Sequence, residues 1–146
     1  MSALDELYRE VILEHYKSPR NLGRLNEPDV ATRGHNPLCG DDVEISLDLE
    51  SGVVHDIRFQ GKGCSISQAS ASMLTEAVKG KTTAEAREIV EAFKSMLHGE
   101  PLTRDDLGDL EALQGVRKYP VRIKCALLAW TTLLEGLDLY AKSDRS

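Results

Sequence analysis

Two adjacent segments alternate between apolar and polar residues, and this alternation restricts the fold more than any other feature of the sequence. In residues 43–49, VEISLDL, every odd-numbered position is apolar. After Ser51-Gly52, residues 53–60 repeat the pattern less regularly. A period of two is typical of a β-strand with one buried face. The sequence therefore predicts two half-buried strands joined by a tight turn.

The register of this hairpin follows from keeping the apolar positions on one face. A two-residue turn that pairs Glu50 with Val53 would place odd-numbered residues opposite even-numbered ones, which does not suit a sheet with one buried face. Pairing Leu49 with Val53 avoids this conflict. Gly52 then takes the left-handed third position of a three-residue loop, where glycine is favoured. We therefore expect the longer loop.

This register predicts that three residues with reactive or metal-binding side chains meet at the open end of the hairpin. Continuing the ladder outward sets Asp41 opposite Gly61 and Cys39 opposite Gly63, and Cys64 follows directly. We expect the side chains of Cys39, Asp41 and Cys64 to lie close together.

The rest of the chain predicts one irregular connection and several helices. Residues 19–38 are rich in Pro, Gly and Asn and predict an extended, irregular connection. Apolar spacing, capping residues and glycine stops predict helices over about 4–17, 69–78, 82–98, 103–113 and from Pro120 onward. The expected fold class is α+β, a small antiparallel β-sheet of at least two strands with helices packed on one face. No repeat or linker divides residues 1–146, so we expect a single domain.

Charge and composition exclude several kinds of partner. The formal net charge of -6 argues against a sequence-independent grip on nucleic acid. The N-terminus shows no signal peptide, and the longest nearly apolar stretch, residues 126–134, is too short to span a bilayer. We expect a soluble cytoplasmic protein that binds neither nucleic acid nor membrane.

The three cysteines are an odd number for a disulfide framework. In a cytoplasmic protein, reduced cysteines are metal ligands, nucleophiles or small buried residues. Cys39, Cys64 and Cys125 together with the Asp41 carboxylate form a donor set that suits tetrahedral zinc. Their wide spacing is weak evidence by itself. The alternative is that the three cysteines are only small buried apolar residues, which fits Cys125 on its helix better than Cys39 or Cys64.

A site of this kind needs nearby positive charge. Three thiolates and a carboxylate around a divalent zinc leave two excess negative charges, which burial makes costly unless cations or amide donors lie close. Arg122 stands one helical turn before Cys125, so it is the best candidate to offset that charge.

Four segments resemble the U-type iron–sulfur assembly proteins, the family of IscU, SufU and the N-terminal domain of NifU. They are residues 14–23, EHYKSPRNLG; 36–41, NPLCGD; 61–67, GKGCSIS; and 122–126, RIKCA. The resemblance covers most of the chain, with the motifs in the family's order. It implies the family's α+β fold and a site formed by Cys39, Asp41, Cys64 and Cys125.

Three departures from the IscU pattern make the chain more similar to SufU. Lys124 stands where IscU proteins carry a histidine, residues 118–122 do not match the stretch recognised by the IscU-dedicated Hsp70, and the gap before Cys125 is longer, with the extra segment within residues 95–118. For the SufU branch, the resemblance implies a tightly held zinc and a SufS-type cysteine desulfurase as partner.

The expected function is that of a zinc-dependent sulfur acceptor, a sulfurtransferase if it is an enzyme. Cys39 would take the persulfide sulfur from the desulfurase and pass it to downstream assembly proteins or apo-proteins. The alternatives are a scaffold that binds a transient [2Fe–2S] cluster on the same ligands, and a protein with a purely structural zinc. The sequence leaves open the occupant of the site, the sulfur recipient, the oligomeric state and which cysteine carries the persulfide.

Overall fold

A computed structural model describes residues 3–38, 40–100 and 107–143 of the chain. The elements, in order, are α1 (Ala3–Lys17), β1 (Val30–Asn36), β2 (Asp41–Glu50), β3 (Val53–Lys62), α2 (Ser65–Val78), α3 (Thr83–Leu97), the 3-10 helix η1 (Gly108–Lys118) and α4 (Pro120–Ser143). The predicted α+β class is confirmed.

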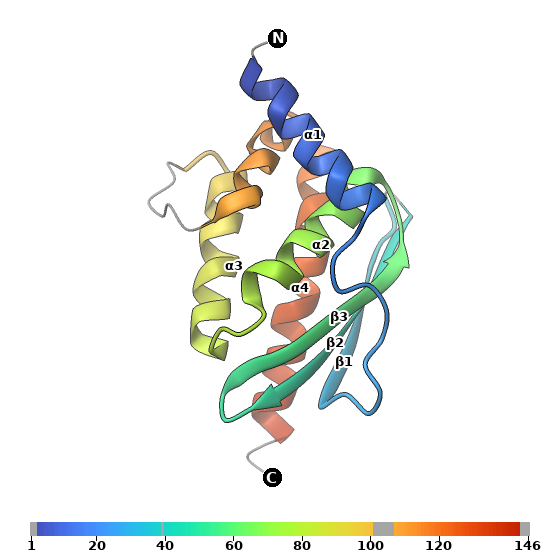
Figure 1. Cartoon of the computed structure of the whole chain (residues 1–146), viewed down its shortest axis with the longest axis vertical. Helices are drawn as coiled ribbons and strands as arrows, with labels where there is room; N and C mark the ends of the chain where they lie inside the picture. Colours follow the sequence, from blue (N-terminus) through green and yellow to red (C-terminus); the bar gives the residue numbers. More distant parts are fainter. Residues whose placement is uncertain (1–2, 39, 101–106, 144–146) are drawn as a thin grey trace.

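The sheet is antiparallel, with the strand order β1-β2-β3. Helix α4 packs across β1 and β2, and α2 packs against β3, so helices cover one face as predicted (Figure 1). The odd-numbered residues of β2 lie on this face; Ile45 and Leu47 are fully buried. The ring of Trp130 on α4 stacks on Phe93 of α3 with the ring centroids 4.2 Å apart. The core therefore lies between the sheet and the helices.

The other face of the sheet is partly covered by the connection between α1 and β1, drawn in blue in Figure 1. Leu22 forms an isolated parallel bridge with Phe59 at the edge of β3. The chain then crosses the other face, where the Leu25 N–H donates to Ser46 Oγ at 3.1 Å. Ser46 is only 1% exposed although it belongs to the polar set of the alternation. The irregular connection was predicted, but its last part forms the strand β1, which the sequence analysis missed.

The hairpin between β2 and β3 has a two-residue turn, so the predicted three-residue loop is wrong. Glu50 pairs with Val53, where we had expected Leu49. Ser51 and Gly52 have φ values of 54° and 76°. Two successive residues with positive φ match the twist of antiparallel strands, which favours this turn.

A β-bulge resolves the conflict that argued against the two-residue turn. The register shifts between residues 48 and 49, and beyond the shift odd-numbered residues again face odd-numbered ones. His55 is the extra residue on β3, and it is exposed. Ile45 consequently lies opposite Phe59 rather than Ile57, so the pairs beyond the bulge differ from the prediction by two residues.

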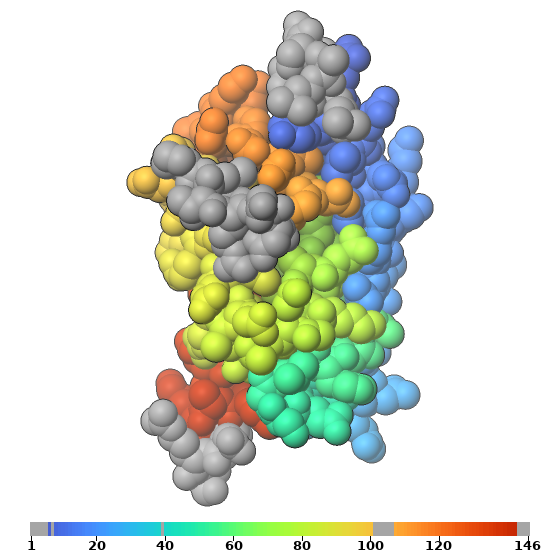
Figure 2. All heavy atoms as spheres, turned by 60° about the vertical axis from the view of Figure 1, so that its left-hand side comes forward, coloured from blue at the N-terminus to red at the C-terminus, as the bar shows by residue number. Residues whose placement is uncertain are grey.

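The tip of the hairpin is held by the connection between α2 and α3, as Figure 2 shows for the green hairpin and the yellow-green chain beside it. The Val54 N–H donates to the Lys81 carbonyl at 2.8 Å, and the Thr83 N–H donates to the Gly52 carbonyl at 2.9 Å. These bonds fix the start of α3 on the sheet.

The helix boundaries agree with the sequence in part. Thr82 and Glu85 form a capping box at the predicted start of α3, and Pro120 begins α4 as expected. Helix α2 begins at Ser65, four residues before the predicted start at Ala69. Within the described parts of the chain, no helix has the length and apolar character needed to cross a membrane.

The segment before α4 differs from the helix predicted over residues 103–113. Residues 101–106 lie outside the described residues. The part that follows is the 3-10 helix η1, which continues past the predicted end at residue 113 as far as Lys118. Its Leu110 and Leu113 side chains are buried, so packing stabilises a helix that is long for its type.

Candidate metal centre

Asp41, Cys64 and Cys125 come together at the open end of the hairpin, although Cys125 is far from the others in sequence. Asp41 is the first residue of β2 and has no exposed surface, while Cys125 lies on α4 and is 1% exposed. One potential ligand atom from each of the three residues lies within 4.8 Å of the other two. The predicted meeting of Asp41 with Cys64 is therefore observed. Cys39, the fourth predicted ligand, lies outside the described residues.

Cys64 is fixed by the start of α2. It is the N-cap residue of that helix, and its Sγ accepts a hydrogen bond from the Ser67 N–H at 3.5 Å. Its own N–H donates to Asp41 Oδ1 at 2.9 Å. The amide dipoles of the first turn of α2 point their positive ends at this sulfur. Ser67 was not predicted as part of the site, although its position three residues after Cys64 is the spacing of a helix cap.

Gly63 leaves room for this arrangement. A Cβ atom on Gly63 would overlap Asp41 Oδ1 and would lie 2.5 Å from Ser67 Oγ. Both distances are below what real Cβ contacts show, so a side chain here must displace the carboxylate or the cap of α2.

We expect Gly63→Ala to lower zinc affinity by about 10- to 100-fold, the usual effect of disturbing the residues that orient metal ligands. Chelator competition measures the affinity. Gly115→Ala is the matched control, since a Cβ at Gly115 meets nothing within 4 Å. Equal affinity of the two variants would contradict the account of Gly63.

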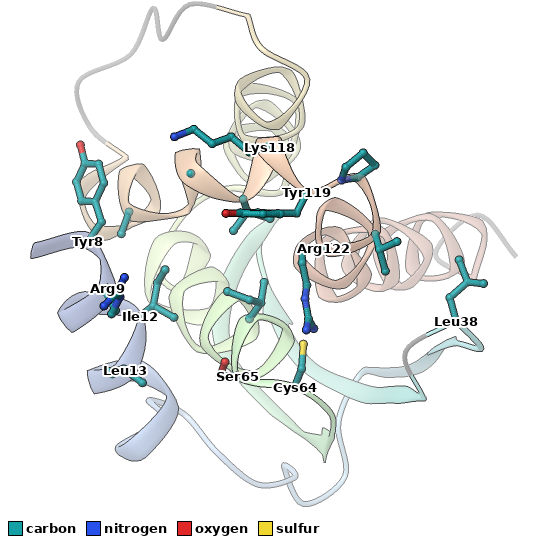
Figure 3. Close-up of a pocket in the computed structure, with 16 residues that line it drawn as sticks. Tyr8, Arg9, Ile12, Leu13, Leu38, Cys64, Ser65, Lys118, Tyr119 and Arg122 are labelled. Atoms are coloured by element: carbon teal, nitrogen blue, oxygen red, sulfur yellow. The ribbon is translucent and has the colours of Figure 1, made fainter. Parts of the chain in front are cut away.

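Arg122 extends across the centre from the first turn of α4. Figure 3 shows its guanidinium group directed at Cys64 Sγ. The charge interaction with Cys64, and a hydrogen bond and charge interaction with Cys125, raise the pKa of Arg122 above its ordinary value. The side chain predicted from sequence to offset negative charge is therefore beside both sulfurs.

The described donor atoms suit zinc. Cys64 Sγ and Asp41 Oδ2 are 4.0 Å apart. A tetrahedral zinc with bonds of about 2.3 Å to sulfur and 2.0 Å to oxygen places neighbouring ligands about 3.5 Å apart, so a small adjustment suffices. Two sulfurs and one carboxylate oxygen also leave a fourth position for another ligand.

The centre opens onto a cleft between α1, the start of α2 and the junction of η1 with α4 (Figure 3). Several large apolar side chains near the opening are exposed: Leu38 by 65%, Tyr119 by 61% and Val121 by 55%. Arg9 and Lys118 add basic groups to the same cleft. An exposed apolar surface beside a reactive centre is typical of a protein-binding face.

His35 and His15 both lie outside the cluster of Asp41, Cys64 and Cys125, one on the surface and one in the interior. His35, which stands near Cys39 in sequence, is exposed and bonds to Asp42, and it does not join the cluster. His15 is fully buried, with Nδ1 2.8 Å from Ser72 Oγ and Nε2 2.9 Å from Asp109 Oδ2. These bonds tie α1 to α2 and η1 and occupy both ring nitrogens, so His15 has a structural role.

The site and the fold agree with one family of known proteins. The model of the NifU-like N-terminal domain family matches residues 7–142. The chain belongs to this family. The resemblance to U-type iron–sulfur assembly proteins that the sequence predicted is thereby confirmed.

Individual members of the family are similar over nearly their whole length. The zinc-dependent sulfurtransferase SufU of Bacillus subtilis is 50% identical over 135 residues, which cover 92% of this chain and 91% of that protein. The iron–sulfur cluster assembly scaffold protein IscU of Streptococcus pyogenes is 41% identical over 144 residues, covering 98% and 90%. The crystal structure of a NifU-like protein (N-terminal) from Brucella abortus superposes with a TM-score of 0.87 at 30% identity, covering 97% of this chain and 99% of that one.

Proposed function

We propose that this protein accepts sulfur from a cysteine desulfurase at a zinc centre, as a step of iron–sulfur cluster assembly. The observation that carries the proposal is the convergence of Asp41, Cys64 and Cys125 beside Arg122 at an open cleft. The 50% identity with a protein named as a zinc-dependent sulfurtransferase supports the same function.

In this proposal, zinc is held by Cys39, Asp41, Cys64 and Cys125. Bound zinc supplies positive charge that keeps the cysteines deprotonated at neutral pH. The Arg122 guanidinium offsets the remaining negative charge at the two described sulfurs. The amide dipoles of α2 do the same at Cys64.

Cys39 is the proposed sulfur acceptor because the other two cysteines are fixed by helices. Cys64 caps α2, and Cys125 is buried on α4. The Cys39 thiolate attacks the outer sulfur of the desulfurase persulfide. A new S–S bond forms to Cys39, the S–S bond of the donor breaks, and the donor cysteine leaves as a thiolate. No net oxidation or reduction occurs, and the persulfide on Cys39 is passed on to cluster assembly.

The surface around the cleft suits a protein that brings its own reactive cysteine. The exposed side chains of Leu38, Tyr119 and Val121 provide apolar contact area at the opening. We propose that a SufS-type cysteine desulfurase docks on this face, so that its persulfide reaches the centre while water is excluded from the cleft.

The test is an assay of a SufS-type desulfurase with and without this protein, with the metal content of the protein measured in parallel. We expect faster alanine formation from cysteine, about one zinc per chain, and a protein whose mass increases by that of a sulfur atom. A desulfurase rate that does not change at any concentration of this protein would contradict sulfur acceptance.

A second candidate function is a scaffold on which a [2Fe–2S] cluster is built. The 41% identity with an IscU scaffold protein favours it, and the same ligands would serve. Anaerobic reconstitution with iron and sulfide separates the two functions. A stable visible spectrum of a cluster supports the scaffold, whereas zinc that resists displacement by iron supports sulfur transfer.

A further inference from the structure

Asn36 is the last residue of β1 and lies next to the centre. It pairs directly with Asp41 in the ladder between β1 and β2. Residues directly opposite each other on antiparallel strands project their side chains from the same face of the sheet, with Cβ atoms about 5 Å apart. The Asn36 side chain therefore leaves the sheet on the same side as the Asp41 carboxylate.

The packing of β1 against α4 places Asn36 close to the turn that carries Cys125. Thr32 Oγ1 donates to the carbonyl of Thr132, and two residues later Gly34 lies against Thr132 and Leu128. A step of two residues along β1 therefore corresponds to about one turn of α4 toward its start. The next step along β1 reaches Asn36, and the next turn of α4 carries Cys125, so we infer that Asn36 lies close to Cys125.

The Asn36 amide has one buried donor without a partner. The residue is 7% exposed, and its Oδ1 accepts from the Leu38 N–H at 3.1 Å. This bond identifies the oxygen, so the other atom is the NH2 group. Among the described residues, Asn36 Nδ2 is the buried side-chain nitrogen or oxygen with no hydrogen-bond partner. Buried polar groups of this kind are rare, and each needs an explanation such as a functional role or a nearby ion.

We propose that, when the centre holds its metal, Asn36 Nδ2 donates a hydrogen bond to the anionic ligands and so positions them. The inference rests on the proposed zinc centre, whose ligands carry more negative charge than the metal neutralises. An N–H donor beside Asp41 and Cys125 lowers the cost of burying that charge, as donors around metal ligands generally do. Asn36 is thus a positioning residue, and it is distinct from the ligands themselves.

Two substitutions of Asn36 remove the NH2 group in different ways. Asn36→Asp keeps the shape and the oxygen that accepts from Leu38, but it replaces the NH2 group by a second oxygen. Asn36→Ser keeps a short acceptor for the same turn and adds no charge. Asn26→Asp and Asn26→Ser are the matched controls, because Asn26 is exposed and lies in the connection between α1 and β1.

We expect both Asn36 variants to bind zinc about 10- to 100-fold more weakly than wild type in chelator competition, with the Asn26 variants unchanged. Bound Co²⁺ reports on the ligands directly. Its thiolate-to-metal absorption band should shift in the Asn36 variants and stay in place in the controls. Circular dichroism of the metal-free proteins checks that each variant folds.

Zinc affinities of the Asn36 variants within twofold of their Asn26 controls would overturn this inference and leave the proposed function intact. If both Asn36 variants fail to fold without metal, the amide serves the fold itself and the inference is also overturned. Wild-type protein that binds no zinc would overturn the inference together with the proposed function.

Discussion

An Asp41→Asn variant is expected to bind zinc more than about 100-fold more weakly than wild type, a larger effect than the loss of an outer hydrogen bond. Asp41 has no exposed surface, and its carboxylate lies 4.0 Å from Cys64 Sγ. Asparagine has nearly the same shape and retains an oxygen for the Cys64 N–H. The substitution therefore removes the charge and one ligand oxygen while it preserves the junction of β2 with α2. Chelator competition measures the change.

Asp42→Asn is the control for this experiment. Asp42 is the next residue, but its side chain is 43% exposed and bonds to His35 on the other face of the sheet. The same chemical change there should leave zinc affinity as in wild type. Similar affinities for the Asp41 and Asp42 variants would remove the carboxylate from the ligand set.

A Cys39→Ala variant is expected to accept no sulfur and to abolish the stimulation of the desulfurase. The reason is chemical: alanine has no nucleophile to attack the persulfide. The two remaining cysteines do not substitute for it, because Cys64 is bonded to the first turn of α2 and Cys125 is buried. Mass spectrometry after reaction with the desulfurase measures the added sulfur, and alanine formation measures the rate.

Zinc content measured in the same samples separates loss of the nucleophile from loss of the metal. A Cys39→Ala protein that retains zinc and gains no sulfur would support Cys39 as the acceptor. Stimulation equal to that of wild type would assign the transfer to another cysteine. Asp42→Asn again serves as the control and should accept sulfur normally.

The sequence predicted the hairpin because alternation is a local property. In residues 43–49, each side chain independently prefers one face, so the strand and its buried face follow without knowledge of the rest of the chain. The capping box at Thr82 and the helix start at Pro120 are local in the same sense. These features predicted the α+β class, and the family motifs indicated the candidate site residues.

The register and the third strand could not be predicted in this way. With the two-residue turn at Ser51-Gly52, a bulge at His55 is needed to return the apolar residues of β3 to the buried face of the sheet. A bulge has no simple pattern in sequence. In β1, the sequence VATRGHN has few apolar residues. Its position depends on close packing of Gly34 against α4, since a Cβ there would overlap Thr132.

The sequence by itself thus determined the β2–β3 hairpin and the helix starts with clear capping signals, and it brought Asp41 close to Cys64. Only the tertiary structure showed that Cys125 and Arg122 lie at the site formed by Asp41 and Cys64. Both residues belong to α4, the last element of the chain, and the helices α2, α3 and η1 separate that element from the hairpin in sequence. The tertiary structure also left the Asn36 amide, opposite Asp41 in the sheet, buried without a partner among the described residues. Contacts between residues far apart in sequence depend on how whole helices pack, and no local pattern encodes that packing.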